Sequence, residues 1–336
     1  MEKTPTLFGE ALGGLKPEAP VSNGRLTLLP FTCRRPGTTR YVLLEKAIRR
    51  GRLTVTEVSD GGAVPYLKAQ NMGPWPVLIF DGEELIGAKQ NRIVNTTILV
   101  GVGETILPVS CVEQGRWSHR SRAFAAGQWA SHPRLRREKE AQVRNALAFA
   151  PEAAPGMARP QAERARDYQA DQGEVWREVE RHSRDLGVGS DTHAMADAYA
   201  DRAPDLEEVL FAFGGQGSKA GPGTPPVEGM VGAAVFLDGA FLCLDTLWSV
   251  RRYGQIYAKL LRGYALEGLQ APPVKKAKAT DPEAEVLRLF AELGAAKPLE
   301  RAGVDLGTDL RVETKTAFGA GLAFEGDMVQ LSVFPR

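Results

Sequence analysis

A dense group of charged, amide and thiol side chains lies between residues 81 and 117, beside stretches that are predicted to be buried strands. The basic members could bind phosphate oxygens, and the carboxylates could bind hydroxyls, a divalent ion or a water. The group consists of Asp81, Glu83, Lys89, Gln90, Asn91, Arg92, Asn95, Cys111, Glu113, Arg116 and Trp117. Because a buried charge costs several kcal/mol unless it is paired or bound, this composition indicates either a ligand site or a network of internal ion pairs.

Three residues of the group are candidates for catalysis. Glu83 and Glu113 could act as an acid/base pair, although nothing in the sequence fixes their separation. Cys111 lies two residues before Glu113 on the same face of a predicted strand, where Arg116 or His119 could activate a thiolate. A free cysteine is more often inert core filling, and we favour that interpretation of Cys111.

The other members are candidates for ligand binding. We expect Lys89, Arg92 and Arg116 to hold phosphates and Trp117 to stack on a base. The carboxylates would then bind ribose hydroxyls, and the amides would donate and accept hydrogen bonds. The predicted ligand-binding set is Asp81, Lys89, Gln90, Asn91, Arg92, Asn95, Arg116 and Trp117.

The sequence leaves the metal content of this site open. A hard cation such as Mg²⁺ could bind the carboxylates of Asp81, Glu83 or Glu113. The histidines of the chain are His119, His132, His182 and His193. None of the spacings typical of zinc ligands occurs among them, so the sequence disfavours a zinc site.

A segment rich in basic and aromatic residues, 116–144, follows the group. Such a pattern can form a nucleic-acid groove with stacking platforms. However, Glu138 and Glu140 interrupt the basic run, and 42 Lys and Arg against 41 Asp and Glu give the chain a formal net charge of only +1. We therefore expect a loop followed by a solvated helix face, and we disfavour nucleic acid as a partner.

The elements that must position the group are short strands separated by turns. Alternating or continuous apolar runs predict strands at 53–58, 64–71, 76–80, 91–100 and 105–112. Asp-Gly at 81–82 and 238–239 and Glu-Gly at 325–326, each between apolar runs, predict three hairpins that could be true repeats or convergent turns. Further elements are predicted as helices at 40–50, 135–149, 167–186, 191–202, 254–269 and 283–294, and as strands at 230–245 and 310–334.

This order of elements predicts an α+β fold with a strand-rich N-terminal part, a helical middle and a mixed C-terminal part. A length of 336 residues suggests about two domains. We place an N-terminal extension at 1–40, an α+β core at 41–270, and a linker, helix and terminal β-hairpin at 271–336. Composition predicts loops or linkers at 151–163, 214–229 and 271–282.

Composition also bounds the location of the protein. The longest apolar run is far shorter than the about 18 residues of a membrane span, and the first 15 residues lack the features of a secretory signal. The three cysteines, Cys33, Cys111 and Cys243, are odd in number and widely spaced, which is typical of a reducing compartment. We therefore expect a cytoplasmic protein with no membrane partner.

Long motifs carry a resemblance to a known family. They are PVLIFDGEELIGAKQNRIVNTTILV with LPVSCVEQGRW, and later QGEVWREVERHSRDLGVGSDTHAMADAY with MVGAAVFLDGAFLCLDTLW. From about residue 40 to 270 the chain resembles the ADP-ribosylglycohydrolase- and rhodanese-phosphatase-superfamily-associated proteins. The resemblance implies a mainly bacterial protein that is associated with genes for the processing of ADP-ribose and NAD derivatives. It implies a small-molecule or ADP-ribosyl ligand, but no settled reaction and no established catalytic residues.

Two hypotheses of different classes follow. In the first, the chain binds an ADP-ribose-like or other NAD-derived nucleotide at residues 81–117. If the chain is an enzyme, we expect it to be a hydrolase that acts on that ligand. In the second, the chain is a non-catalytic module, and the same charged hairpins form an oligomer or partner interface. The sequence leaves homo-oligomerisation and any cofactor other than Mg²⁺ open.

Overall fold

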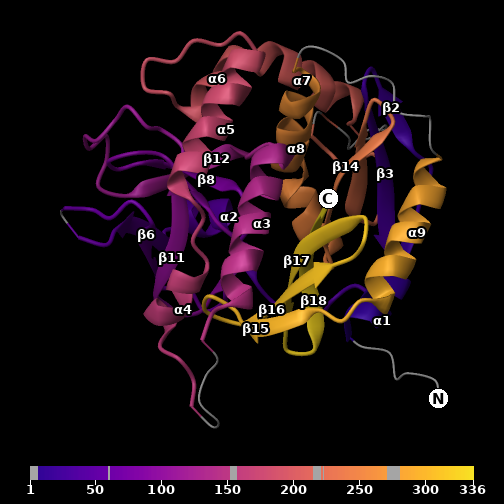
Figure 1. Ribbon diagram of the computed structural model, residues 1–336, viewed down its shortest axis with the longest axis horizontal. Helices are drawn as coiled ribbons and strands as arrows, with labels where there is room; N and C mark the ends of the chain where they lie inside the picture. The colour runs from indigo at the N-terminus through magenta and orange to yellow at the C-terminus, as the bar shows by residue number, and fades with distance from the viewer. Residues whose placement is uncertain (1–6, 60, 152–156, 215–220, 222, 271–280) are drawn as a thin grey trace. The chain divides into compact units, whose positions relative to one another are not determined.

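The computed structural model describes residues 7–59, 61–151, 157–214, 221, 223–270 and 281–336. Over these residues it contains nine helices and eighteen strands, which confirms the predicted α+β fold (Figure 1). The chain forms two compact units. Unit 1 comprises 1–39, 205–300 and 308–336, and unit 2 comprises 40–204 and 301–307. The three-part division made from the sequence stays a prediction, and the loops predicted at 151–163, 214–229 and 271–282 fall partly outside the described residues.

Unit 1 is built on an antiparallel sheet in which β13 pairs with β3 and β14, and β18 pairs with β14 and β17. The strands of this unit are β1 (Leu15–Pro17), β2 (Val21–Asn23), β3 (Leu26–Cys33), β13 (Met230–Leu237), β14 (Ala240–Leu247), β16 (Thr308–Glu313), β17 (Ala317–Phe324) and β18 (Asp327–Pro335). Strand β15 (Leu299–Ala302) spans the boundary between the units. The sheet therefore joins strands that lie about 200 residues apart in the sequence.

Helices cover this sheet on two sides. In Figure 1, α8 and α9 lie on opposite sides of β3 and β14. Leu289 and Leu293 of α9 share a core cluster with Phe31 and Leu244, whereas Tyr264 of α8 donates a hydrogen bond to Asp245 at 2.7 Å. Successive strand side chains point to opposite faces, so Leu244 and Asp245 serve different helices. The helices are α1 (Leu7–Gly13), α7 (Ala203–Ala212), α8 (Val250–Gly268) and α9 (Pro282–Ala295).

Two of the three predicted hairpins join paired strands. Gly239 lies in the turn between β13 and β14, and Gly326 lies in the turn between β17 and β18, with φ of 82° and 81°. The residues before them, Asp238 and Glu325, also have positive φ, as a tight hairpin turn with the twist of the sheet requires. The sequence signal therefore reports the pairing correctly at these two places.

The third turn, at Asp81 and Gly82, connects strands that pair with other partners. The preceding strand pairs with β4 and β10, and the following one pairs with β9 and β12. The N–H of Phe80 donates to the Glu83 carboxylate at 2.9 Å, and that of Asp81 donates to the Thr97 hydroxyl at 3.0 Å. These side chains accept the backbone N–H groups that would otherwise pair the two strands with each other. Residues 77–88 therefore form a turn between two sheets and not a hairpin.

Unit 2 contains the candidate site and has two sheets. One is antiparallel in the order β12-β8-β9-β11-β6-β5, and the other has the order β10-β7-β4 with a parallel β4–β7 pair. The strands are β4 (Val42–Leu43), β5 (Leu53–Glu57), β6 (Tyr66–Asn71), β7 (Val77–Ile79), β8 (Glu83–Gly87), β9 (Arg92–Val94), β10 (Ile98–Val100), β11 (Gly103–Cys111) and β12 (Phe124–Ala130). The predicted strand at 91–100 thus divides into β9 and β10, which belong to different sheets.

The helices of unit 2 pack beside these sheets. They are α2 (Leu44–Arg49), α3 (Pro133–Ala148), α4 (Gln161–Asp167), α5 (Gln172–Asp185) and α6 (Met195–Asp201). Helices α3 and α5 contact each other, and α4 and α5 contact β11. Asp171 caps α5 by accepting the N–H of Glu174 at 3.0 Å, which starts a new helix inside the predicted 167–186 span. Among the described residues, no helix combines the length and the apolarity needed to cross a membrane.

Candidate functional site

The Asp81 carboxylate lies between two buried cations of α3. Lys139 Nζ contacts Oδ1 at 2.8 Å, and Arg136 Nε contacts Oδ2 at 3.1 Å. Arg136 and Lys139 are 1% and 0% exposed, so the expected solvated helix face is wrong for these residues. Burial lowers the pKa of Lys139, and Asp81 opposes that shift. Asp81 is thus engaged in an internal ion cluster, and a Mg²⁺ ion at this carboxylate would have to compete with both cations.

Gly82 makes the approach of α3 to this turn feasible. Its φ is 77°, and a Cβ at this position would lie 2.4 Å from Ser131 Oγ and 3.0 Å from the Arg136 side chain. Only a residue without a side chain fits both the backbone conformation and the space. The Asp-Gly pair therefore places Asp81 beneath the first turns of α3.

Glu113 and Arg116 form a second buried ion pair. Arg116 Nε and Nη2 donate to the two carboxylate oxygens at 2.8 and 2.6 Å, and the N–H of Asn91 donates to Oε2 at 3.0 Å. Burial alone would raise the pKa of Glu113, but the bonds from Arg116 and Asn91 outweigh it and hold the pKa below its usual value. A carboxylate held ionised in a bidentate pair is a poor proton donor, so this geometry favours a positioning role for Glu113.

Glu84, which the sequence analysis did not single out, has the most altered carboxyl group of this region. It is 1% exposed and accepts hydrogen bonds from Trp129 Nε1 and from Asn91 Nδ2, the latter at 3.2 Å. Burial raises the pKa of Glu84 to about 8. Its neighbour Glu83, one of the three predicted catalytic residues, accepts the backbone N–H of Phe80 within the turn.

Arg92 differs from the other buried cations because much of its hydrogen-bonding capacity is unused. The side chain is 0% exposed, and Nη1 donates to Gln90 Oε1 at 3.0 Å. Within the described part of the chain, neither Nε nor Nη2 has a hydrogen-bond acceptor. Burial lowers the pKa of Arg92, yet a guanidinium stays charged in a protein. A buried charged group with two unused donors is costly and points to an acceptor supplied from outside the chain.

Three other side chains surround this guanidinium and define, with it, the Arg92 group: Arg92, Lys89, Trp117 and Glu57. The Trp117 ring, 49% exposed, lies 5.8 Å from Arg92 Cζ and 5.2 Å from Lys89 Nζ. Glu57 accepts the N–H of Lys89 through Oε1 at 3.3 Å, whereas Oε2 has no partner among the described residues. The group thus combines two cations, a half-exposed aromatic ring and a carboxylate oxygen that can accept a hydroxyl.

Gly62 allows three members of the Arg92 group to come together. With a φ of 73°, it passes so close that a Cβ would lie 3.3 Å from Glu57 Oε2 and from Lys89 Cδ, and 3.5 Å from Trp117. Lys89 Nζ donates to the neighbouring carbonyl of Gly61 at 2.7 Å. The loop after β5, which the sequence analysis did not consider, therefore completes the group.

The remaining predicted residues have partners inside the fold. Asn95 donates to the Tyr168 carbonyl at 3.0 Å, Gln90 Nε2 donates to the Glu113 carbonyl at 3.0 Å, and Asn91 links Glu84 to Arg116. Cys111 is fully buried, and burial raises the pKa of its thiol although Arg92 opposes the shift. A buried thiol with a raised pKa is a weak nucleophile at neutral pH.

A second part of unit 2 has related chemistry in a surface hollow of about 420 Å³. Its lining includes the basic side chains of Lys46, Arg50 and Arg52 and the ring of Trp75. Arg40 Cζ lies 5.5 Å from the Trp75 ring. These basic residues are at the surface, where a cation is solvated and needs no ligand. The hollow is therefore the comparison site for any experiment on the Arg92 group.

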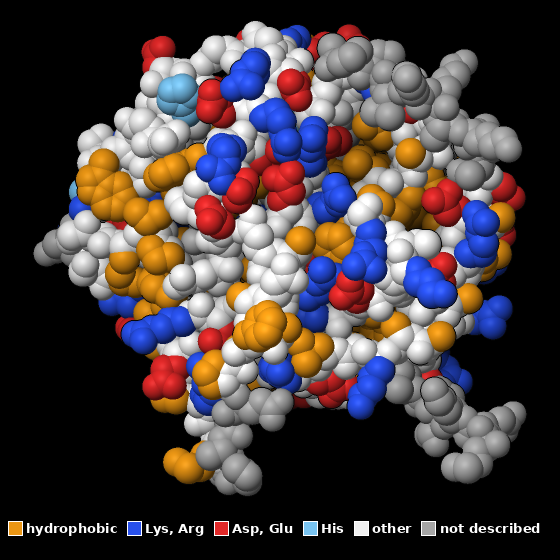
Figure 2. Space-filling view, in the orientation of Figure 1, with side chains coloured by type: hydrophobic (Ala, Val, Ile, Leu, Met, Phe, Trp, Pro, Cys, Tyr) orange, Lys and Arg blue, Asp and Glu red, His pale blue; other side chains and the backbone are white. Residues whose placement is uncertain are grey.

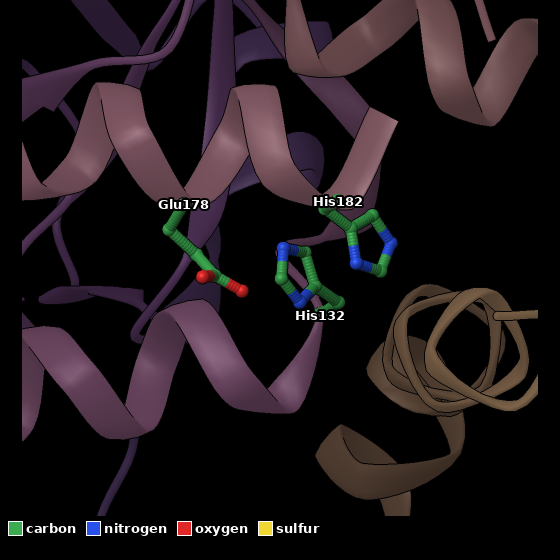
Figure 3. A group of neighbouring side chains, drawn as sticks. All are labelled: His132, Glu178 and His182. Carbon is green, nitrogen blue, oxygen red and sulfur yellow. The ribbon is translucent and has the colours of Figure 1, made fainter. Parts of the chain in front are cut away.

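A separate cluster joins two of the histidines with a carboxylate. Glu178 and His182 come from one face of α5, and His132 directly precedes α3 (Figure 3). All three are buried, and the possible ligand atoms lie within 4.8 Å of one another. Burial and the neighbouring His132 hold the pKa of His182 well below its usual value. The sequence shows no ligand spacing here because 46 residues separate His132 from Glu178, and only the four-residue step from Glu178 to His182 is local.

The comparisons with known proteins give one match. A family model described as the ARG and Rhodanese-Phosphatase-superfamily-associated Protein domain matches residues 14–334. No curated protein and no solved structure matches the chain. The match extends beyond the span of about 40 to 270 over which the sequence motifs carry their resemblance, and it includes both compact units.

Proposed function

We propose that this chain, which belongs to the family of ARG and Rhodanese-Phosphatase-superfamily-associated proteins, binds a phosphate-bearing nucleotide of the ADP-ribose class at the Arg92 group. The observation that carries the proposal is the buried Arg92 guanidinium with two unused donors. Phosphate oxygens match the planar donor fork of arginine, and the Lys89 ammonium adds a second positive charge. The expected cytoplasmic location belongs to the same proposal.

The position of Trp117 suggests how the ligand would enter. The ring lies over Arg92 and Lys89 and is half exposed, so its displacement would open the guanidinium to solvent. A displaced ring could then stack on the base, while the free Oε2 of Glu57 accepts a ribose hydroxyl. In this arrangement the phosphates, the ribose and the base each meet a group of matching chemistry.

The same geometry argues against using the charged turns as a binding interface, the alternative hypothesis. Glu83 and Lys89 are 1% and 9% exposed, so neither presents its charge to a partner surface. Hydrolysis of the bound nucleotide is a separate question. Two of the predicted catalytic residues, Glu113 and Cys111, are engaged within the fold. Incubation with ADP-ribose, with and without Mg²⁺, followed by chromatography for AMP and ribose 5-phosphate, tests that step.

Substitution of Arg92 tests the proposal directly. We expect Arg92→Met to weaken ADP-ribose binding by about 10- to 150-fold, because a charge-assisted hydrogen bond contributes about 1.5–3 kcal/mol. We also expect the midpoint of thermal unfolding without ligand to stay equal or to rise, since the substitution removes a buried charge with unused donors. Calorimetric titration and thermal unfolding measure the two quantities. A lower unfolding midpoint with unchanged affinity would show that Arg92 is structural.

A pair of tryptophan variants locates the base. We expect Trp117→Ala to weaken ADP-ribose binding by about 5- to 150-fold, as loss of one stacking contact costs about 1–3 kcal/mol. Binding of inorganic pyrophosphate, which has no base, should not weaken, because removal of the ring also exposes Arg92. Trp75→Ala is the matched control because Trp75 is similarly exposed, at 44%, and also lies beside a cation. If Trp75→Ala weakens ADP-ribose binding and Trp117→Ala does not, the ligand binds in the 420 Å³ hollow and the proposed site is wrong.

A further inference from the structure

The His132 triad, consisting of His132, Glu178 and His182, places two buried imidazoles beside a buried carboxylate. Glu178 and His182 lie one helical turn apart on α5, so their side chains project from the same face. His132 is held at the start of α3 by the proline that follows it, and α3 packs against α5. Two helices of one compact unit therefore bring two imidazoles and a carboxylate to one point.

The arrangement of the three side chains is compact. Figure 3 shows the His132 ring between the Glu178 carboxylate and the His182 ring. The two imidazole rings lie 3.7 Å apart with an interplanar angle of 10°, and the possible ligand atoms are within 4.8 Å of one another. Two ligand atoms on a four-coordinate Zn²⁺ are about 3.4 Å apart, since each bond is about 2.1 Å long. To bind one ion, the two stacked rings must turn so that one nitrogen of each points at it.

The positive charges beside Glu178 disfavour a bound cation, but their side chains can move into solvent. Arg181 pairs with Glu178 on α5, and Arg134 Nε lies 3.6 Å from Oε1 of the same carboxylate. Both arginine side chains are more than one third exposed, at 38% and 36%. Arg181 also donates to Glu138 Oε1 at 2.9 Å, so it keeps a partner when Glu178 turns towards the imidazoles.

The Glu178 end of the triad lies next to a surface hollow. Glu178 and Arg181 line a surface hollow of about 640 Å³ between α3 and α5, together with Glu138, Gln142 and Glu174. Figure 2 shows Lys and Arg side chains mixed with Asp and Glu over this face of the unit. An ion would therefore approach the triad from the side of Glu178, past the partly exposed Arg181 side chain.

We propose that His132, Glu178 and His182 bind one divalent transition-metal ion of the class of Zn²⁺, Fe²⁺ and Co²⁺. Imidazole nitrogens suit these ions and not the hard cations Mg²⁺ and Ca²⁺, which prefer oxygen ligands throughout. Three protein ligands leave at least one coordination position open, which is typical of sites that hold a water or a substrate. The proposal is independent of nucleotide binding, because it uses none of the residues of the Arg92 group.

Titration of the full chain with Co²⁺ after dialysis against a chelator tests this site without any substitution. We expect one equivalent to bind with a Kd below about 1 µM and to give the intense visible absorption of a four- or five-coordinate ion. Competition with Zn²⁺ should abolish that absorption with the same stoichiometry, and excess Mg²⁺ should not. Absence of binding, or only the pale spectrum of the hydrated ion, would overturn the proposal.

Variants assign the ligands. We expect His182→Gln and Glu178→Gln each to lower Co²⁺ affinity by at least about 100-fold, beyond the 10–100-fold typical of residues that only support a ligand. His119→Gln is the matched control, since His119 is exposed and outside the triad, and it should leave affinity unchanged. Equal affinity of the His182 variant and the wild type would place the ion elsewhere and overturn the assignment.

Substitution of Arg181, a partly exposed neighbour of Glu178, tests the site even if the variants of the buried ligands fold poorly. Arg181→Gln removes an exposed positive charge that competes with the ion for Glu178, so we expect Co²⁺ affinity to rise by about 3- to 10-fold. Arg184→Gln, one turn along α5 and paired with Glu180 instead, should change affinity less. Equal effects of the two substitutions, or a weaker affinity in Arg181→Gln, would contradict binding at Glu178.

Discussion

Replacement of Asp81 by asparagine is expected to lower the free energy of unfolding by about 3–5 kcal/mol, one of the two largest effects that the structure predicts for a single side chain. Asp81 accepts from Lys139 and Arg136, both essentially without exposure to solvent. Asparagine keeps the size of the side chain but removes its charge. Two buried cations would then lose the carboxylate that balances them, and such an uncompensated charge is among the costliest defects in a core.

Urea denaturation followed by tryptophan fluorescence measures this effect. Trp75, Trp117, Trp129 and Trp176 belong to unit 2 and only Trp248 belongs to unit 1, so the signal reports mainly the unit that contains Asp81. Glu180→Gln is the control, because it breaks an exposed pair with Arg184 and should change stability by less than about 1 kcal/mol.

A second variant separates loss of the ion cluster from general damage. Lys139→Met, combined with Asp81→Asn, removes one of the stranded cations and keeps an apolar stem of similar length. We expect the double variant to recover part of the lost stability. Removing both members of a buried ion pair costs less free energy of unfolding than removing one and leaving the other charge unpaired. If Asp81→Asn unfolds no more easily than Glu180→Gln, Asp81 does not balance these cations, and its availability to a ligand must be reconsidered.

The sequence predicts the turn that carries Asp81, but not the two cations that pair with it. Asp81 and Gly82 form a local turn signal, which the sequence carries in adjacent residues. Arg136 and Lys139 look like the solvated face of a basic helix, because a cation buried by a distant carboxylate has the same local pattern as one in water. The two are distinguished only by the packing of α3 on the turn, 55 residues away.

The same limit applies to the fold. Strand β13 lies within the predicted strands at 230–245, yet its pairing with β3 joins residues 230–237 to residues 26–33 and has no local signature. By contrast, the hairpin at Asp238 and Gly239 was predictable because the turn and both of its strands are contiguous. Local chemistry therefore predicts the elements, whereas which strands meet is decided by burial of their faces against one another.

The candidate site divides along the same line. Residues 81–117 were expected to gather charge, and the structure shows most of those charges paired inside the fold. Arg92 is the exception, because its Nε and Nη2 have no acceptor among the described residues. Glu84 escaped notice because its neighbour Glu83 has the same residue type. Both glutamates are 1% exposed, and the hydrogen bond from Trp129 distinguishes Glu84 from Glu83.

That burial of Glu84 leads to a second large expected effect, a fall in stability with rising pH. The pKa of Glu84 is about 8 in the folded chain, against an ordinary value of 4.5. Between these values the folded state keeps a proton that the unfolded state has released, so a rise in pH favours unfolding. Each pH unit in this window lowers the free energy of unfolding by up to about 1.4 kcal/mol.

Between pH 6.5 and 8 the effect of this carboxyl group exceeds that of the buried imidazole. Below pH 6.5 the buried His182 acts in the opposite direction, because its lowered pKa makes the folded state release a proton that the unfolded state binds. Above pH 6.5 the imidazole of the unfolded state also loses its proton, so this opposing effect shrinks towards pH 8. The free energy of unfolding, measured in urea at half-unit steps, should therefore fall steadily from pH 6.5 to 8 in the wild type.

Glu84→Gln should flatten this dependence, because the amide does not titrate, and the variant should be the more stable protein relative to wild type as pH rises. Glu174→Gln, at an exposed position of α5, should leave the wild-type slope intact. The fluorescence of Trp129, whose Nε1 donates to Glu84, gives an independent signal from the native state. It should titrate near pH 8 in the wild type and not in Glu84→Gln. An identical slope in wild type and Glu84→Gln would mean that Glu84 is already ionised in the folded chain, and that its partners Asn91 and Trp129 stabilise the charge in spite of burial.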